Sequence, residues 1–349
     1  SDKTRYACDG LKNQRLDTPY IKEDNKFKKV SWNQAYEAIV KKINKTPPEK
    51  IACLTGDLTN METMYVAKEF FDKTLKSKHI DSRSDYFYVN NLNRSNYIFN
   101  SKINGIEESD LIILIGTNPR YEATILNARI RKAYIKNKTK IYSLGDQGDL
   151  TYPYEVIPAN SKIIKNICDN GHEISNKIIN SKKPMIIIGQ SALKLKSSKF
   201  IFESIKNFLI SNNKISDNWN ALNIISENAS TVGGYDLDLL GTDNEKNITL
   251  EEIEKNNFDI IFLLGQDNVN FNKKKEFIIY VGSHGDKGAE IADVVLPGAT
   301  YTEQDGFYTN LEGKMQKAFQ ATYPPGDAKE DWLIINELSK LLKRKKIFK

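Results

Sequence analysis

The amino-acid sequence predicts an α/β fold made of two doubly wound units, each built on a parallel sheet. The first observation is a short run of Ile, Leu and Val that ends in glycine and small polar residues. Because these runs do not alternate with polar residues, both faces of each strand are expected to be covered by helices. The pattern occurs in KIACLTGD (50–57), DLIILIGTN (110–118), PMIIIGQS (184–191) and DIIFLLGQD (259–267).

The second observation is a helical pattern after these strands. Asn118 can cap a helix and Pro119 can occupy its first turn, and apolar residues then recur at helical spacing as far as Ala133. A similar pattern follows the first strand, at 61–76. Further strand patterns at 140–146 and 276–283 give each unit at least three strands, as a Rossmann-like arrangement requires.

The chain is long enough for about two domains at the usual size of about 150 residues each. Two prolines in YPYEVIPAN (152–160) mark the most plausible boundary. We therefore predict four parts: an extended N-terminal arm at 1–40, a first α/β unit at 41–160, a second at 161–298, and a C-terminal segment at 299–349 that packs on both units.

Composition excludes several classes of function. The formal net charge is +6, but acidic and basic residues are mixed along the chain and aromatic residues do not alternate with basic ones, so no nucleic-acid binding is predicted. No apolar run reaches the roughly 18 residues of a membrane-spanning helix. Cys8, Cys53 and Cys168 lie far apart, without metal-ligand spacing, so no metal site is predicted.

The chain also lacks the common nucleotide motifs. No GxGxxG follows a strand and no GxxxxGK[ST] occurs. The loop GSHGDKG (282–288) can form an anion-binding nest near Lys287, or only a tight turn. Within this loop, His284 can act as a general base if Asp286 orients it, or can simply be a loop histidine bonded to the backbone. We predict no catalytic residue.

One stretch has the composition of a site. In ADVVLPGATYTEQDGFYTNLEGKMQ (292–316) an apolar strand pattern runs into the turn at Pro297 and Gly298, and glutamate, threonine and asparagine follow. Polar residues directly after a buried strand are typical of ligand crevices in α/β proteins. They are equally able to bond to loop backbone groups that would otherwise be buried without a partner.

Several long blocks together resemble a known family. They are SDKTRYACDGLKNQRLDTP, DLIILIGTNPRYEATILNARIRK, GSHGDKGAEIADVVLPGATYTEQDGFYTNLEGKMQ and PPGDAKEDWLIINELS. In this order they resemble the large iron–sulphur (75 kDa) subunit of respiratory complex I, in its C-terminal, molybdopterin oxidoreductase-like portion only. The resemblance runs to about Leu342. It implies a molybdopterin oxidoreductase-like fold. Since the cysteine-rich half is missing and the chain starts abruptly, we expect a split subunit, or a fragment.

The resemblance also implies where an ancestral crevice lay. Turns of the GTNP type touch the nucleotide end of the pterin in relatives, and the segment after ADVVLP lines the pterin. In many relatives a cysteine, selenocysteine or serine before GTNP holds the metal, but here the nearby Cys53 lies inside a predicted strand. We therefore expect no bound cofactor, and a vestigial crevice lined by Gly116, Thr117, Asn118, Glu303, Gly306 and Asn310.

The implied function is that of a structural, non-redox domain in the peripheral arm of complex I, which supports electron transfer from NADH to ubiquinone by partner subunits. The expected partners are the cysteine-rich half, which holds the iron–sulphur clusters in a separate chain, and other peripheral-arm subunits. The expected location is the matrix side of the mitochondrial inner membrane, or else the cytoplasmic face of a bacterial plasma membrane. Two alternatives stay open: an active molybdopterin-dependent oxidoreductase subunit, and a free-standing nucleotide- or phosphate-binding α/β protein.

Overall fold

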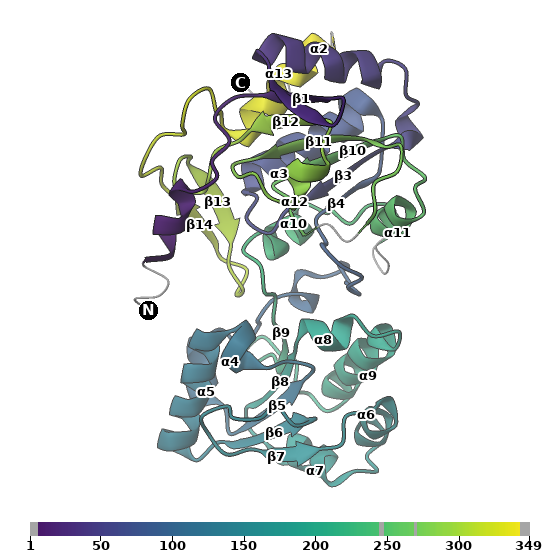
Figure 1. Cartoon of the computed structure of the whole chain (residues 1–349). Helices are drawn as coiled ribbons and strands as arrows, with labels where there is room; N and C mark the ends of the chain where they lie inside the picture. The colour runs from purple at the N-terminus through teal and green to yellow at the C-terminus, as the bar shows by residue number, and fades with distance from the viewer. Residues whose placement is uncertain (1–5, 244–247, 269–270, 343–349) are drawn as a thin grey trace.

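The computed structural model describes residues 6–243, 248–268 and 271–342, which form two lobes, each around its own sheet (Figure 1). The larger lobe has a seven-stranded sheet and the smaller a five-stranded one. Residues 1–5 of the predicted arm and 343–349 of the predicted C-terminal segment lie outside the described residues.

The large sheet has the strand order β2-β1-β12-β11-β10-β3-β4. Its strands from β12 to β4 are parallel, while β1 and β2 form an antiparallel hairpin at one edge. The strands are β1 (Tyr20–Glu23), β2 (Lys26–Lys29), β3 (Ile51–Thr55), β4 (Ile80–Asp81), β10 (Ile260–Leu264), β11 (Phe277–Gly282) and β12 (Val294–Pro297).

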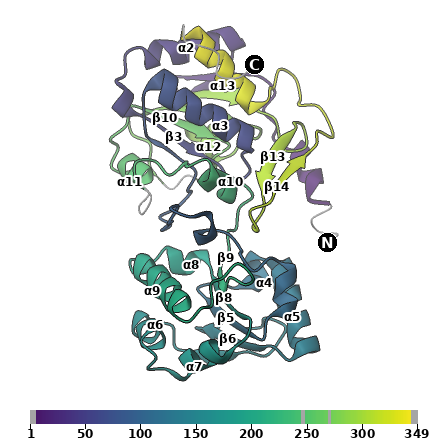
Figure 2. The same cartoon turned by 180° about the vertical axis from the view of Figure 1, so that it is seen from behind.

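Helices cover both faces of this sheet, as continuous aliphatic strands require. On β3, Cys53 faces one core, while Ala52 and Leu54 face the other. The first core is closed by α2 (Trp32–Ile43), α3 (Met61–Glu69), its π-helical extension η3 (Phe70–Leu75) and α13 (Asp331–Leu341). The second is closed by α11 (Ile248–Glu254) and α12 (Lys287–Ile291). Figure 2 shows the side that α3 and α13 cover.

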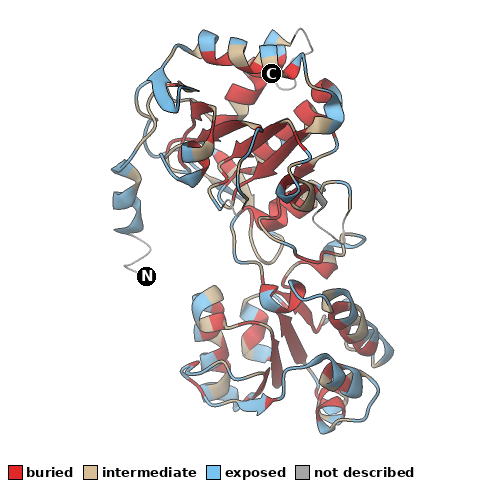
Figure 3. Cartoon of the chain, turned by 45° about the vertical axis from the view of Figure 1, so that its right-hand side comes forward, coloured by how far each residue is buried: buried red, intermediate tan, exposed pale blue. Residues whose placement is uncertain are grey.

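The small sheet is parallel throughout, in the order β7-β6-β5-β8-β9. Its strands are β5 (Leu111–Ile115), β6 (Lys140–Leu144), β7 (Glu155–Ile157), β8 (Pro184–Ile188) and β9 (Leu222–Ile224). One face packs on α5 (Thr124–Asn137), and the other on α6 (Ser161–Cys168), α7 (Glu173–Asn180) and α9 (Ser198–Ser211). Figure 3 shows both sheets as the most continuously buried parts of the chain.

Short elements complete the described chain. After β5, Asn118 caps α4 (Pro119–Glu122) and Pro119 occupies its first turn, as predicted. The helical conformation is interrupted at Ala123, which lies between α4 and α5. The others are η1 (Ala7–Lys12), η2 (Pro48–Lys50), η4 (Arg94–Asn96), η5 (Asn104–Glu108), α8 (Gln190–Leu193), α10 (Thr231–Asp236), and the hairpin β13 (Gly306–Thr309) and β14 (Met315–Ala318).

The predicted fold class, with two doubly wound units, is confirmed, but the units do not follow one another along the chain. The small lobe is inserted between β4 and β10, so the large sheet joins strands from both ends of the described chain. This differs from the units predicted at 41–160 and 161–298. A buried aliphatic run indicates a parallel strand but not its neighbours, and β3 pairs with β10, which lies far along the sequence.

The predicted N-terminal arm at 1–40 also differs from the structure. Residues 20–29 form the edge hairpin of the large sheet, with Tyr20 opposite Val295 on β12, and α2 begins at Trp32. The hairpin KFKK strand is exposed and carries three lysines, which protect a sheet edge against pairing with other chains. Because this strand is polar and exposed, a search for buried aliphatic runs does not find it.

Candidate functional site

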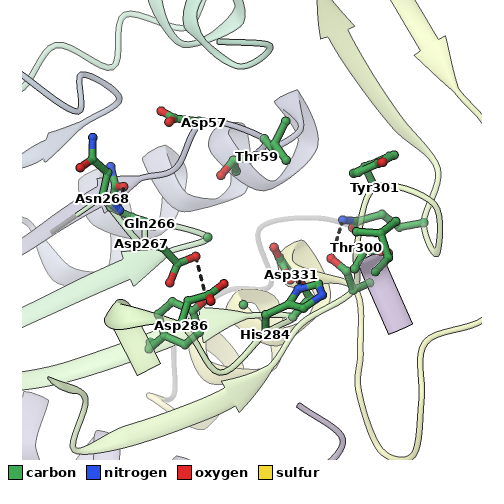
Figure 4. Close-up of a pocket in the computed structure, with 18 residues that line it drawn as sticks. Asp57, Thr59, Gln266, Asp267, Asn268, His284, Asp286, Thr300, Tyr301 and Asp331 are labelled. Atoms are coloured by element: carbon green, nitrogen blue, oxygen red, sulfur yellow. Dashed lines mark hydrogen bonds between the residues drawn. The ribbon is translucent and has the colours of Figure 1, made fainter. Parts of the chain in front are cut away.

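A cavity of about 320 Å³ lies at the carboxyl ends of β3, β10, β11 and β12 (Figure 4). Its walls include residues 57–59 after β3, 265–268 after β10, 282–284 at the end of β11 and 299–301 after β12. β3 and β10 are neighbours in the sheet. The strand that follows β3 in the chain, β4, lies on one side of this pair, and those that follow β10, namely β11 and β12, lie on the other side. The cavity therefore lies where the strand order reverses, the place where open α/β sheets bind ligands.

Two glycines set the shape of the cavity at this reversal point. A Cβ atom on Gly56 would lie 1.7 Å from the carbonyl oxygen of Gly265, so the loops after β3 and β10 approach more closely than any side chain allows. Gly265 itself has φ of +61°, the left-handed region that favours glycine. The Gly56 N–H and the Thr59 hydroxyl both donate to the Leu264 carbonyl oxygen, at 2.8 and 3.1 Å. These bonds bring Asp57 close to the loop that carries Asp267.

The cavity is acidic. Asp57, Asp267, Asp286 and Asp331 line it, no lysine or arginine is among the described residues that do, and His284 is the lining side chain that can carry positive charge. Burial raises the pKa of Asp57. Burial, with the neighbouring charge of Asp286, also raises the pKa of Asp267, although the Tyr280 hydroxyl donates to it at 3.1 Å. Such an arrangement favours ligands that bring positive charge or N–H donors.

Asp331 is the most strongly perturbed of these groups. It lies at the start of α13 and is only 7% exposed. Burial raises its pKa to about 7. The hydrogen bond from the Ala299 N–H lowers the pKa in part, and the charge of Glu330 raises it slightly. Its Oδ1 atom has no hydrogen-bond partner among the described residues, and neither has Oε1 of Gln304, whose Nε2 donates to the Ala299 carbonyl oxygen. Two buried acceptors of this cavity are thus unsatisfied.

The raised pKa of Asp331 predicts a pH-dependent effect of the substitution Asp331→Asn. The unfolded chain releases this proton near pH 4, whereas the folded protein holds it up to about pH 7. Between these values the folded state binds more protons, so wild-type stability falls as pH rises. The variant lacks this loss. We expect its unfolding free energy relative to wild type to increase by about 1 to 3 kcal/mol between pH 5 and pH 8, measured by urea denaturation. A difference that stays constant across this range would contradict the assignment.

The loop GSHGDKG is already bonded within the chain. Gly285 donates its N–H to the Gln14 carbonyl oxygen at 3.0 Å, and Gly288 donates to the Asp267 carboxylate at 3.3 Å. His284 shares a hydrogen bond of 2.8 Å between its Nδ1 and the Ser283 hydroxyl, and no hydrogen bond joins it to Asp286 among the described residues. The loop therefore lacks the arrangement of a phosphate nest or of an oriented general base.

The predicted crevice residues after β5 lie in the small lobe. The Thr117 hydroxyl and the Asn118 N–H both donate to the Glu122 carboxylate, at 2.7 and 2.8 Å, so a side chain of the protein occupies the position of an anion. Gly116 has φ of +58°, and a Cβ atom there would lie 2.5 Å from the backbone nitrogen of Ala192. The strand order of this sheet reverses between β5 and β8, and the chain itself fills the reversal point.

The other three predicted residues follow β12 in the large lobe. Glu303 accepts hydrogen bonds from the Arg15 guanidinium, one of them at 2.6 Å, and from the Thr300 N–H at 3.0 Å. Although burial opposes its ionisation, these bonds hold the pKa of Glu303 below its usual value. Gly306 packs against Asn60, and Asn310 accepts the N–H groups of Glu312 and Lys314 in the hairpin turn.

The structure thus places the six predicted residues in two lobes, and none of them lines the cavity. Of the acids that do line it, Asp286 was considered in the sequence as a partner of His284, whereas Asp57, Asp267 and Asp331 were not singled out. Asp57 directly follows the glycine at the end of a predicted strand and Asp267 comes two residues after one, so the repeated ending in glycine and aspartate was a usable signal. Asp331 had no such signal, because only the fold brings α13 to the ends of the strands.

Comparison with known proteins places the chain in a family. Residues 15–341 match the family Molybdopterin oxidoreductase. The chain belongs to the molybdopterin oxidoreductase family. The match therefore covers nearly all of the described chain, including both lobes.

Individual relatives are more specific. The chain is 39% identical over 360 residues to the NADH-ubiquinone oxidoreductase 75 kDa subunit of Reclinomonas americana, covering 99% of this chain and 52% of the relative. It is 39% identical to an NADH-quinone oxidoreductase subunit of Rickettsia conorii and 38% identical to the mitochondrial 78 kDa subunit of Candida albicans, covering 50% and 47% of them. The chain spans about half the length of these curated relatives. The resemblance that the sequence blocks indicated is confirmed.

Solved structures support the same fold. A chain of the formyltransferase/hydrolase complex from Methylorubrum extorquens has a TM-score of 0.68 at 12% identity, covering 93% of this chain and 99% of that one. Acetylene hydratase from Pelobacter acetylenicus has a TM-score of 0.54 at 13% identity, covering 96% and 63%. At these identities the likeness concerns the fold alone.

The residues of the cavity do not fit a molybdopterin cofactor. The pterin carries phosphate, whereas four carboxylates and no lysine or arginine line the described cavity. Cys53 is fully buried within β3, and burial raises the pKa of its thiol, so it is not available as a thiolate ligand. Nor do the described residues bring three or more His, Cys, Asp or Glu side chains together as a metal site would need.

Proposed function

We propose that this chain is a structural, non-redox part of the peripheral arm of respiratory complex I, NADH:ubiquinone oxidoreductase. The observation that carries the proposal is 39% identity, over 99% of the chain, to the 75 kDa subunit of Reclinomonas americana. Subunits from Rickettsia and Candida align over almost the whole chain as well. In this role the chain maintains the shape of the arm, and partner subunits transfer electrons from NADH to ubiquinone.

The non-redox role is supported by the chemistry of the crevices. An electron-transferring domain of this family needs a bound cofactor, but the cavity of the large lobe is acidic. In the small lobe, Glu122 and the chain around Ala192 occupy the reversal point of the sheet. These features weigh against an active molybdopterin-dependent oxidoreductase subunit. The bonded loop GSHGDKG weighs in the same way against a free-standing phosphate-binding protein.

The proposed partners are a cysteine-rich half that holds the iron–sulphur clusters and other subunits of the peripheral arm. The proposed location is the matrix side of the mitochondrial inner membrane, or the corresponding face of a bacterial plasma membrane, since relatives of both kinds align. Within the described part of the chain, no helix combines the length and apolar character needed to cross a membrane.

The test is separation of respiratory membranes on a native gel, followed by mass spectrometry and metal analysis of the band that oxidises NADH. We expect this chain in that band, together with cysteine-rich sequence and iron, and without molybdenum in proportion to the chain. A chain that migrates apart from the activity would refute membership of the complex. Molybdenum in a one-to-one ratio to the chain would refute the non-redox role.

A further inference from the structure

The acidic cavity of the large lobe is a binding site that the proposed function does not explain. Its volume of about 320 Å³ is in the range of small-molecule sites. It lies at the reversal point of the sheet, where the fold presents loop residues to a ligand. Figure 4 shows Asp57, Asp267 and Asp331 grouped around one space. A purely structural role requires no such space.

The charged side chains that line the cavity are carboxylates, with no lysine or arginine among the described residues to balance them. Four carboxylates line it, and the buried Oδ1 of Asp331 and Oε1 of Gln304 are without donors among the described residues. Both of these atoms have almost no accessible surface, so the attraction for a ligand comes from the carboxylates that line the cavity. The cavity therefore selects a donor with positive charge, and it repels anions.

The walls of the cavity narrow the chemical class further. Leu11, Leu58, Tyr280 and Tyr301 also line it, so that apolar and aromatic surface lies next to the carboxylates. A planar guanidinium presents several N–H donors to carboxylates and packs its faces on aromatic rings, while an alkyl stem covers apolar side chains. A compact metal ion uses none of these walls, and the described carboxylates are not grouped as metal ligands.

We propose that this cavity binds a guanidinium group on an alkyl stem, held by Asp267 and Asp331. Asp57 also lines the cavity, and one of its oxygens accepts a hydrogen bond from Asn228 at 2.7 Å. The group comes either from a free small molecule or from an arginine side chain of a neighbouring subunit. Both sources present the same chemistry to the cavity. The proposal concerns the folded chain itself and does not depend on membership of complex I.

The experiment is isothermal titration of the full chain at pH 7.5 with agmatine, which carries a guanidinium on an alkyl amine. We expect one site per chain. Asp267→Asn and Asp331→Asn are each expected to weaken binding roughly 10- to 100-fold, the usual worth of a hydrogen bond to a charged group. Asp217→Asn, at an exposed position of the small lobe, is the matched control and should bind as wild type does.

Further measurements keep the test decisive. Thermal melting checks that each variant folds, and Asp57→Asn, at a half-buried position, replaces any variant that does not. Putrescine and pyrophosphate should bind at least tenfold more weakly than agmatine or not at all. The proposal is overturned if agmatine does not bind at millimolar concentration, if the cavity variants bind as the control does, or if putrescine binds equally well.

The same titration on the assembled complex distinguishes the two sources. If the complex does not bind agmatine while the separate chain does, an arginine of a neighbouring subunit occupies the cavity. If both bind, the natural ligand is a free small molecule. Failure of the chain to migrate with NADH oxidation would refute the proposed function and leave the titration result intact.

Discussion

Replacing Arg83 with alanine is expected to lower the free energy of unfolding by about 3 to 5 kcal/mol. Arg83 and Asp81 have fully buried side chains where the chain leaves β4 for the small lobe. The guanidinium donates to both Asp81 oxygens, at 3.0 and 2.7 Å, and to the carbonyl oxygens of Leu240 and Asp243, at 2.8 and 2.9 Å. Its removal leaves a buried carboxylate unpaired and deprives these carbonyl groups of a donor.

The ion pair also links the two chain segments that connect the lobes. Asp81 ends β4, and Leu240 lies on the segment that returns from the small lobe, so Arg83 bonds the outgoing and returning chains together. We expect urea denaturation to detect the loss as a lower midpoint. Because the penalty comes from the unpaired charge, the double variant Asp81→Leu/Arg83→Met should be more stable than Arg83→Ala.

An exposed ion pair provides the control for this prediction. Lys28 and Glu23 pair on the edge hairpin with side chains more than half exposed, 59% and 57%. Lys28→Met should change the free energy of unfolding by less than about 1 kcal/mol, since exposed pairs contribute little. An Arg83→Ala variant no less stable than Lys28→Met would show that water or rearrangement compensates the buried charge.

The local structure of this protein could be predicted from short stretches of sequence. A buried strand needs only a run of aliphatic residues, and a helix start needs only a cap such as Asn118 before Pro119. The assignment of strands to sheets needs information that no stretch contains. β3 and β5 have the same pattern, yet β3 pairs with β10 across the inserted lobe. The domain boundary predicted at 152–160 therefore lies between β5 and β8, which are neighbouring strands of the small sheet.

The candidate site shows the same limit. Gly116, Asn118 and Asn310 have the residue types of a ligand turn, but each has a local structural role, namely a left-handed backbone, a helix cap and a hairpin turn. Such roles produce the same sequence signal as a ligand does. The cavity instead depends on Asp331, at the start of the last described helix, which only the folded chain brings to the ends of the strands.

Gly56→Ala is expected to lower the free energy of unfolding by more than about 3 kcal/mol, or to prevent folding. The new Cβ atom would lie 1.7 Å from the oxygen and 2.3 Å from the carbonyl carbon of Gly265, and both are backbone atoms that cannot rotate away. Relief requires β3 and β10 to separate at their carboxyl ends, which breaks the bond from the Gly56 N–H to the Leu264 carbonyl oxygen.

Gly10→Ala is the matched control, because a Cβ atom there meets nothing within 4 Å. It should melt within a few degrees of wild type, while Gly56→Ala melts far lower in circular dichroism or yields no folded protein. A Gly56→Ala variant as stable as Gly10→Ala would show that the loops after β3 and β10 separate at little cost. Since those loops carry Asp57 and Asp267, a folded Gly56→Ala chain must also move two of the cavity's acids apart, and it should bind agmatine more weakly than Gly10→Ala does.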